Sequence, residues 1–284
     1  MHLGVARTFL VAWLDARAHD GRLLLRIEDL DGPRTVEGAD ARIMRDLEWL
    51  GLGWDGAPTW QSKRGERYLE ALSALGRRSY PCTCSRKEIR EASAPHGPGD
   101  DGPRYPGTCR DGAKDRPDRT PSVRFRTEPG DLVAHEDRAL GSLDEDVFSR
   151  TGDFVLRRAD GLWAYQHAVT VDDLDQGVSC IVRGDDLAGS TPRQLLLRGA
   201  LSPSAPPIET LHVPLLLDAE GQRMAKRHQS LPVAALREAG EPSEAVIGRL
   251  AASLGWVPEG TRTRAEALVE LWKQACASPV PTSV

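Results

Sequence analysis

Long hydrophobic runs are missing from this sequence. Its longest apolar stretches are much shorter than the roughly 18 residues that a membrane-spanning helix requires. A charged segment followed by an apolar core, the pattern of a secretion signal, does not open the chain. No stretch of the sequence repeats another. These absences predict a soluble, cytoplasmic protein that has no membrane partner.

Cysteine is scarce as well, since the 284 residues contain five. The number is odd, and three of the five fall between residues 82 and 109. Such usage fits a reducing compartment and a metal site better than a set of disulfides. The chain is nevertheless long enough to bury a full core and to hold a catalytic domain with an appended module.

Positive charge is not in excess overall, but it is concentrated in one segment. The formal net charge is -5, whereas residues 77–126 contain 12 Lys and Arg against 7 Asp and Glu. A local basic face can bind phosphate groups even on an acidic protein. A solvated loop with interspersed charges explains the same count, so charge alone leaves both interpretations open.

The start of the chain predicts a helix followed by a strand. Between Leu3 and Ala18 apolar residues recur at helical spacing, and Gly21 separates this helix from the apolar run 23–25. A cluster of carboxylates at 28–31 follows the run, at the edge where open parallel sheets bind ligands. We therefore expect an α/β fold. No strand precedes the first helix in this sequence.

The rest of the chain is divided by a segment rich in Gly, Pro and Asp. This composition, over residues 92–121, predicts a loop that is held by something other than a core. On either side, hydrophobic spacing predicts further elements and a second α/β half. The expected helices are 38–50, 62–76 and 191–201, with helical pattern from 231 to about 277, and the expected strands are 123–125, 154–156, 180–182 and 212–217.

The clustered cysteines predict a metal site. Cys82 and Cys84 stand on alternate residues, and Cys109 follows beyond the loop, four residues after Tyr105. Three thiolates can turn toward one ion, and tetrahedral zinc needs a fourth ligand, which either His96 or Tyr105 could supply. Three unrelated thiols are the alternative. We disfavour it because free cysteine favours burial and this segment is too polar to bury thiols.

A second chemical motif is the basic segment 221–227, which directly follows a predicted strand. A basic loop that starts with glycine at the end of a strand suits the phosphates of a nucleotide. Lys226 would offer a point charge to the group that leaves. A surface hairpin with basic residues would have a similar sequence, so this motif depends on support from the rest of the chain.

That support comes from the order of six segments, in which the chain resembles the glutamyl-tRNA synthetases. They are 2–4, 26–31, the cysteine and tyrosine positions 82, 84, 105 and 109, 163–166, 181–187 and 224–226. The resemblance covers residues 2–255 and is greatest to the short paralogues, the glutamyl-Q tRNA(Asp) synthetases. These keep the class I catalytic core and lack the helical anticodon-binding domain, for which this chain is too short.

The resemblance implies a class I, Rossmann-like catalytic domain divided into four units. These are the first half of the catalytic domain (1–80), a zinc-binding insertion (81–122), the rest of the insertion with the second catalytic half (123–230), and a helical C-terminal segment (231–284).

The implied reaction is activation of L-glutamate by ATP, which gives glutamyl-adenylate and pyrophosphate. The glutamyl group then passes to a ring hydroxyl of the queuosine base in the anticodon of tRNA(Asp). In-line attack on the α-phosphorus requires the protein to position two anions and offset their charge, and a helix N-terminus favours phosphate. An arginine suits the amino-acid carboxylate because it binds bidentately.

The resemblance also assigns residues, metals and partners. It implies catalysis by His2 and Lys226, ATP binding by His2, Gly4 and Lys226, and glutamate binding by Glu28, Tyr165 and Arg183. It further implies one structural Zn²⁺ on Cys82, Cys84, Tyr105 and Cys109, and Mg²⁺ held mainly by ATP. The expected protein is a monomer whose partners are tRNA(Asp), L-glutamate and ATP, with no DNA partner.

Three departures from the family pattern leave more than one hypothesis. The family begins with a strand and an Arg-x-Ala-Pro-Ser-Pro-Thr-Gly segment that helps to bind glutamate, and Met1 stands where this segment should end. Val5 replaces the last His of the histidine motif, and the lysine loop keeps only Lys226 of two lysines. The chain could therefore be an active enzyme whose start lies further upstream, a catalytically impaired tRNA-binding paralogue, or a fragment of a glutamyl-tRNA synthetase that charges tRNA(Glu).

Overall fold

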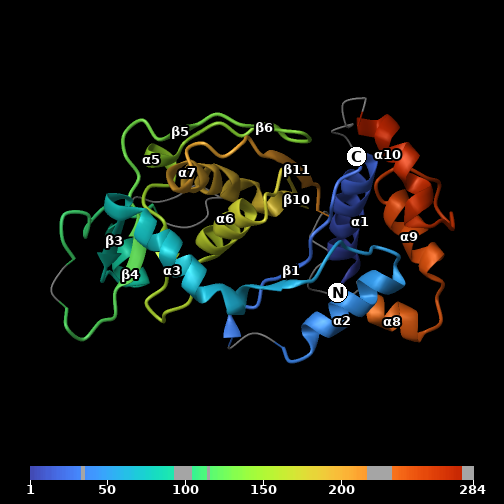
Figure 1. The fold of residues 1–284 in the computed structure, drawn as a ribbon, viewed down its shortest axis with the longest axis horizontal. Helices are drawn as coiled ribbons and strands as arrows, with labels where there is room; N and C mark the ends of the chain where they lie inside the picture. The colour runs from blue at the N-terminus through green and yellow to red at the C-terminus, as the bar shows by residue number, and fades with distance from the viewer. Residues whose placement is uncertain (33–35, 93–103, 114–115, 216–231, 277–284) are drawn as a thin grey trace.

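The computed structural model describes residues 1–32, 36–92, 104–113, 116–215 and 232–276. Its first element is the predicted helix, α1 (Leu3–Ala18). The apolar spacing gives α1 a fully buried face that includes Leu10 and Leu14. In Figure 1 this helix stands between the C-terminal helices on one side and the parallel strands on the other. Residues of α1 form one wall of a cleft between this helix and the parallel strands.

Two pairs of parallel strands flank α1. β1 (Arg26–Ile27) pairs with β2 (Thr59–Trp60), and β10 (Cys180–Gly184) pairs with β11 (Glu209–Val213). The α/β expectation is confirmed, but the described strands do not form one continuous sheet. The predicted strand 23–25 lies just before β1, and its backbone carbonyls at Leu23 and Leu25 accept amides from the segment that leads into β2.

Helices connect and cover these strands (Figure 1). Along the chain, α2 and α3 come between β1 and the cysteine segment, and α6 and α7 come before and after β10. In space α2 packs against α8 (Val233–Glu238), and α6 packs against α7. The other bounds are α2 (Ala39–Trp49), α3 (Gly65–Ala74), α6 (Tyr165–Asp175) and α7 (Thr191–Leu201). The predicted helix 62–76 is therefore shorter than expected, because a 3₁₀ turn (Gln61–Arg64) precedes α3.

An antiparallel sheet forms the end of the molecule farthest from α1 in Figure 1. It has the strand order β3, β4, β9, and a short helix α4 follows β3. A ribbon of two short strand pairs, β5 with β8 and β6 with β7, then runs back toward β11. The bounds are β3 (Ser79–Cys82), α4 (Arg86–Ala92), β4 (Ser122–Phe125), β5 (Leu132–Val133), β6 (Glu136–Asp137), β7 (Gly141–Ser142), β8 (Glu145–Asp146), α5 (Val147–Arg150) and β9 (Val155–Arg157).

The C-terminal helices share one hydrophobic core with α1, α2 and β11. They are α8 (Val233–Glu238), α9 (Ser243–Ala252) and α10 (Val269–Cys276), with a 3₁₀ turn (Ala265–Leu268) before α10. A backbone bridge between His2 and Pro232 ties the start of α1 to the start of α8. The helical pattern predicted for the end of the chain is thus confirmed over the described residues.

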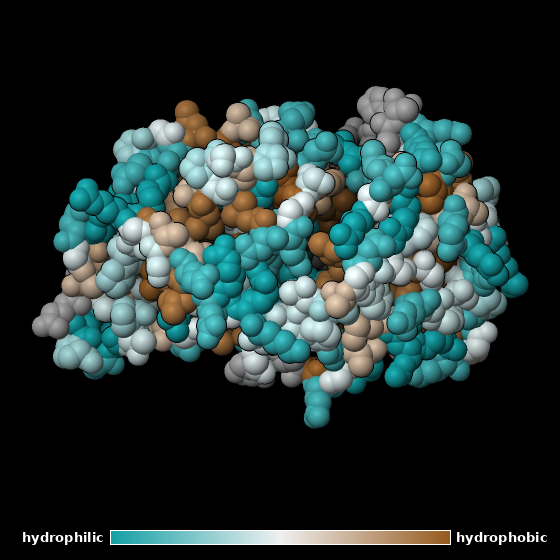
Figure 2. All heavy atoms as spheres, viewed as in Figure 1, coloured by the Kyte–Doolittle hydropathy of each residue, from teal (hydrophilic) through white to brown (hydrophobic). Residues whose placement is uncertain are grey.

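Two further sequence expectations can be compared with the fold. The strand predicted at 212–217 is β11, which begins three residues earlier, and residues 216 and 217 lie outside the described part. Within the described residues, no helix has the length and apolar character needed to cross a membrane. Figure 2 shows a largely hydrophilic face, with apolar residues gathered around α7 and in the hollow beside α1.

Candidate functional site

A cleft of about 1690 Å³ lies between α1, the segment that contains β1, and β10. Five of the residues that the sequence assigned to ATP or glutamate line it together: His2, Gly4, Glu28, Tyr165 and Arg183. They come from four separate regions of the chain: the start of α1, the position after β1, α6 and β10. Lys226, the sixth, lies outside the described residues.

His2 and Gly4 lie at the N-terminal end of α1. His2 is the N-cap, and its Nδ1 accepts the backbone N–H of Val5 at 3.4 Å. Burial, together with the charge of the chain's amino terminus, lowers the pKa of His2, so its ring is neutral at neutral pH. A 16-residue helix presents the positive end of its dipole and free backbone N–H groups here. This end of the cleft is therefore suited to a phosphate group.

Glu28 lies on another wall of the cleft, directly after β1. Its side chain is 45% exposed, and its Oε1 lies 3.6 Å from an Nη of Arg26. Arg26 in turn donates to Asp173 on α6 at 2.7 Å. Desolvation raises the pKa of Glu28, and the Arg26 charge opposes this rise only in part. Glu28 thus provides an accessible carboxylate with room for a cationic group.

Arg183 is 8% exposed and lies on β10. Its Nη1 donates to the side-chain oxygen of Gln194 at 2.7 Å and to the hydroxyl of Tyr165 at 3.3 Å, and its Nη2 donates to Thr191 at 2.8 Å. Its Nε donates to Nε2 of His212 at 3.1 Å. Within the described residues no carboxylate forms an ion pair with this guanidinium. The hydrogen bonds that this guanidinium makes with described residues thus all go to uncharged acceptors, and the carboxylate of Asp173 acts on it only through space.

Several polar residues of the site were not predicted from the sequence. Arg26 and Asp173 line the cleft beside Glu28, and Asp172 is buried one residue away. The Asp172–Asp173 pair is visible in the sequence, but it belongs to none of the motifs that predicted site residues. Its partner Arg26 lies 147 residues earlier in the chain than Asp173, and no local pattern connects the two.

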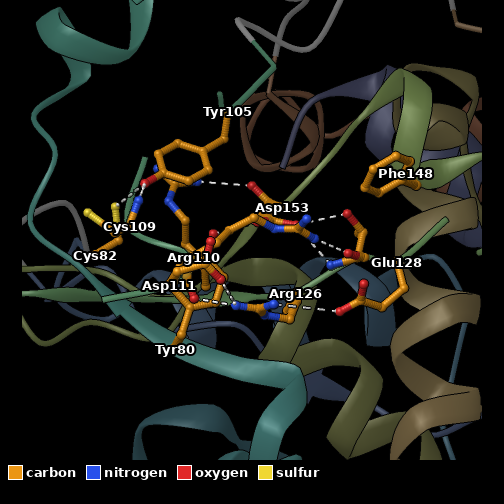
Figure 3. A network of polar contacts seen from close by, with 12 residues as sticks. Tyr80, Cys82, Tyr105, Cys109, Arg110, Asp111, Arg126, Glu128, Phe148 and Asp153 are labelled. Atoms are coloured by element: carbon orange, nitrogen blue, oxygen red, sulfur yellow. Dashed lines mark hydrogen bonds and ion pairs between the residues drawn. The ribbon is translucent and has the colours of Figure 1, made fainter. Parts of the chain in front are cut away.

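The three predicted thiol ligands lie together at the antiparallel sheet. The Sγ atoms of Cys82, Cys84 and Cys109 are all within 4.8 Å of one another, and Cys84 and Cys109 are 3.6 Å apart. The hydroxyl of Tyr105 lies 3.3 Å from Sγ of Cys82 and 3.6 Å from Sγ of Cys84. Figure 3 shows the Tyr105 hydroxyl directed toward the sulfurs of Cys82 and Cys109. The other proposed ligand, His96, is outside the described residues.

This geometry fits a tetrahedral ion. Zn–S bonds of about 2.3 Å place two sulfur ligands about 3.8 Å apart, close to the separations in the cluster. The segment does bury thiols, so the expectation that it is too polar to do so is wrong: Cys82 and Cys109 are each 1% exposed and pack with Tyr80 and Ile89. Burial of free thiols therefore does not distinguish the two interpretations, whereas the convergence of four donor atoms favours a metal.

Polar contacts hold the cluster on the sheet (Figure 3). The guanidinium of Arg124 lies 3.9 Å above the ring of Tyr105. Asp153 accepts the hydroxyl of Tyr80 at 2.5 Å and Nε of Arg110 at 2.7 Å. Burial, with the hydrogen bond to Asp153, raises the pKa of Tyr80 above its usual range. Side chains from β3, β4, the loop and the turn before β9 thus hold together the sheet and loop that carry the donor atoms.

Comparison with known proteins gives consistent results. The family description "tRNA synthetases class I (E and Q), catalytic domain" matches residues 1–272. Glutamyl-Q tRNA(Asp) synthetase from Nitratidesulfovibrio vulgaris is 47% identical over 277 residues, which cover 91% of this chain and 84% of that protein. The protein of the same name from Bordetella bronchiseptica is 50% identical over 232 residues, covering 80% of this chain and 72% of that protein.

The fold has a counterpart among solved structures. A glutamate-tRNA synthetase from Elizabethkingia anophelis matches with a TM-score of 0.79 and 24% identity over 95% of this chain. The chain spans 62% of the length of that synthetase. At this identity the match bears on the fold, and the fold it supports is the catalytic fold of a class I synthetase.

Proposed function

Because the chain belongs to the glutamyl-Q tRNA(Asp) synthetases, within the class I tRNA synthetase family, we propose that it activates L-glutamate with ATP and transfers it to queuosine in the anticodon of tRNA(Asp). A carboxylate oxygen of glutamate attacks the α-phosphorus of ATP, and the bond to pyrophosphate breaks. A queuosine hydroxyl then attacks the activated carbonyl and releases AMP. The same resemblance implies a monomer in the cytoplasm.

The observation that carries this proposal is the charge pattern of the cleft. The buried guanidinium of Arg183 has no carboxylate partner among the described residues, and the carboxylate of Glu28 lines the same cleft. An amino acid carries one group for each of them. Arg183 would bind a carboxylate of glutamate and Glu28 its ammonium group, with the Tyr165 hydroxyl as a further contact.

Nucleotide binding is proposed for the start of α1. His2 and Gly4 would position the phosphates of ATP at the helix N-terminus, where backbone N–H groups and the dipole favour negative charge. A neutral His2 ring can donate one hydrogen bond to a phosphate oxygen. Lys226 is proposed to offset charge on the leaving pyrophosphate. Mg²⁺, bound mainly by ATP itself, would neutralise the phosphates.

We propose that the thiolates of Cys82, Cys84 and Cys109, with the oxygen of Tyr105, hold one zinc ion. Four donors with no open position would make the ion structural, and its binding would stabilise the fold of the surrounding loop. The support comes from the donor distances at β3 and from the position of this sheet, at the opposite end of the molecule from α1 in Figure 1.

We also propose that one more parallel strand belongs between β1 and β10. The carbonyls of Leu23 and Leu25 accept hydrogen bonds from the β2 side. Because the backbone groups of successive residues in an extended segment point to opposite sides, those of Leu24 point toward the cleft. Among the described strands β10 pairs with β11 alone, and residues of β10 line the cleft from the other side. Two open edges that face one space are unfavourable unless a strand pairs with them.

Glutamate-dependent exchange of pyrophosphate into ATP, run without tRNA, tests the activation step. It should be measured on this chain and on a version that carries the family's first strand ahead of Met1. We expect exchange from the extended version, together with a higher melting temperature than that of the shorter chain. Absence of exchange from both versions, with tRNA binding retained, would instead identify a tRNA-binding paralogue.

Transfer of labelled glutamate then tests the acceptor. We expect transfer to tRNA(Asp) that contains queuosine and none to tRNA(Asp) that lacks it. Charging of the 3′ end of tRNA(Glu) would contradict the proposal. The relatives named glutamyl-Q tRNA(Asp) synthetase are 47% and 50% identical to this chain, which supports the first outcome.

A further inference from the structure

A buried pair of residues, Asp137 and His212, stands directly behind Arg183. Both side chains are fully buried, and Nδ1 of His212 lies 2.6 Å from Oδ2 of Asp137. Asp137 ends β6 in the ribbon, whereas His212 is on β11, 75 residues later. His212 is the register partner of Arg183 on the neighbouring strand β10. The ribbon thus contacts the wall of the cleft through this pair.

Asp137 is strongly held as an anion. Thr210 donates its hydroxyl to Oδ2 at 2.6 Å, and the backbone amides of Ala139 and Leu140 donate to Oδ1 at 2.9 and 3.0 Å. Burial alone would raise the pKa of Asp137, but the hydrogen bonds from His212, Thr210 and these amides lower it well below its usual range. An ionised carboxylate can only accept a hydrogen bond. Nδ1 of His212 must therefore carry a proton and donate it.

The other ring nitrogen of His212 meets Arg183. The Nε–H of Arg183 points at Nε2 of His212 across 3.1 Å, so Nε2 has to accept. A proton on Nε2 would place two N–H groups head to head. The geometry therefore selects the neutral ring with its proton on Nδ1, and this tautomer is fixed by the carboxylate of Asp137.

We propose that Asp137 and His212 are positioning residues that orient the Arg183 guanidinium for the carboxylate of the substrate. Through Nε, His212 fixes the plane of the guanidinium, while Thr191, Gln194 and Tyr165 hold its Nη atoms. His212 does this without supplying a negative charge at the guanidinium itself. The charge of Arg183 is thereby left for a ligand. This inference rests on the proposed binding of glutamate at Arg183.

A double-mutant cycle tests the proposal. Asp137→Asn can present an amide N–H to Nδ1, which drives the His212 proton to Nε2 and disrupts the contact with Arg183. We expect roughly a tenfold rise in KM for glutamate in pyrophosphate exchange, with KM for ATP and kcat changed less than twofold. His212→Gln keeps an acceptor for Arg183 in its side-chain oxygen and should largely preserve KM.

The cycle separates positioning from simple structural support. In the His212→Gln background no ring tautomer exists, so Asp137→Asn should raise KM for glutamate by less than twofold. The proposal would be overturned if Asp137→Asn raised KM for glutamate by the same factor with His212 present as in the His212→Gln variant. It would also be overturned if Asp137→Asn raised KM for glutamate and KM for ATP in parallel. Thr210→Val is the matched control, since it removes a different hydrogen bond to the same carboxylate and should leave KM within twofold.

A spectroscopic measurement checks the tautomer without any need for activity. In protein with ¹⁵N-labelled histidine at neutral pH, His212 should show a protonated Nδ1 and an unprotonated Nε2, and Asp137→Asn should reverse this. A ring protonated on Nε2 in the unaltered protein would refute the inference. Failure of exchange and of glutamate binding by the version extended ahead of Met1, with the expected tautomer present, would refute the proposed substrate instead.

Discussion

Arg183 is a buried guanidinium whose described partners are all uncharged. Buried charges are normally paired because removal from water is costly. Here the cost is reduced by acceptors on β11, α6 and α7, which occupy four N–H groups. A substrate carboxylate would complete the pairing in an environment that has already lost most of its water. Because these acceptors surround a planar guanidinium, the shape of the side chain at position 183 should matter for substrate binding as well as its charge.

Replacing Arg183 by lysine tests that requirement. Arg183→Lys keeps the positive charge but loses the planar fork, and it cannot reach Gln194, Thr191 and His212 at once. We expect kcat/KM for glutamate to fall by roughly 10- to 100-fold, mostly through KM. The measurement is pyrophosphate exchange at several glutamate concentrations. A lysine variant with unchanged KM would show that the guanidinium contacts do not serve the substrate.

The proposed role of Glu28 predicts that glutamate affinity depends on pH. The Glu28 carboxylate must be ionised to bind an ammonium group, and desolvation raises its pKa above the ordinary 4.5. Glutamate affinity should therefore weaken as pH falls, beginning at a higher pH than for an ordinary glutamate side chain. Binding measured between pH 8 and pH 5 checks this. Glu28→Gln should bind weakly and lose the dependence, whereas an unaltered profile in that variant would contradict the assignment.

Folding stability should depend on pH in the opposite direction from glutamate affinity. A carboxyl whose pKa is higher in the folded state than in the unfolded state binds protons better when folded, so its contribution becomes less favourable as pH rises through that range. Glu28→Gln should consequently melt at the same or a slightly higher temperature at neutral pH. Weaker glutamate binding without loss of stability would identify Glu28 as a residue kept for its ligand.

Among the helices, α9 has a glycine that packs directly against the backbone of another segment. Gly248 lies in the middle of α9, and a Cβ atom placed there would be 1.7 Å from the carbonyl oxygen of Thr261. The chain that leads to α10 therefore crosses directly over this glycine. α10 in turn packs on α1, which carries His2 at its N-terminus. Both helices that this crossing connects, α9 and α10, thus pack on α1.

Gly248→Ala should destabilise the protein. The methyl group has to displace backbone instead of a flexible side chain, which costs roughly 1–3 kcal/mol or more. Thermal or urea unfolding measures the effect. The matched control is Gly199→Ala in α7, where nothing lies within 4 Å of the added Cβ. Gly199→Ala should raise the free energy of unfolding by roughly 0.5–1 kcal/mol, because alanine favours the helix more than glycine does. Equal effects of the two substitutions would contradict the contact.

At the scale of the whole molecule, the antiparallel sheet that carries Cys82 lies at the end away from α1 in Figure 1, and the ribbon of β5–β8 runs between this sheet and β11. The ribbon is attached near the cleft by Asp137 and by Arg138, which binds Asp15 of α1 through both carboxylate oxygens at 2.8 and 2.9 Å. The two ends should therefore respond differently to loss of a metal.

Removal of zinc should lower stability more than it alters glutamate affinity. We expect one zinc per chain, and chelation should lower the melting temperature by several degrees because ion binding is coupled to folding of the loop. Metal analysis and thermal unfolding check this. Cys109→Ser should lose the metal, whereas Cys180→Ser, at a described cysteine outside the cluster, should keep it. Full metal content in Cys109→Ser would contradict the ligand set.

Local pattern was sufficient for only part of the elements, since α6 and the short strands β3 and β5–β8 were not predicted. The apolar spacing from Leu3 to Ala18 predicted α1, and strand-like runs predicted β4, β9, β10 and β11 to within a few residues. These features depend on neighbours along the chain. The shortened α3 and the two separate strand pairs were not predicted, because they depend on which backbone groups find partners elsewhere.

By itself the sequence determined the helix around which the cleft forms, the spacing of the four metal-ligand candidates, and the order of segments shared with the glutamyl-tRNA synthetases. Tertiary structure alone decided that Glu28 and Arg183 line one cleft. It also placed Asp137 behind His212 and His212 behind Arg183, across 75 and 29 residues. Contacts over such separations arise when a ribbon packs on a strand, and no periodicity in the chain encodes them.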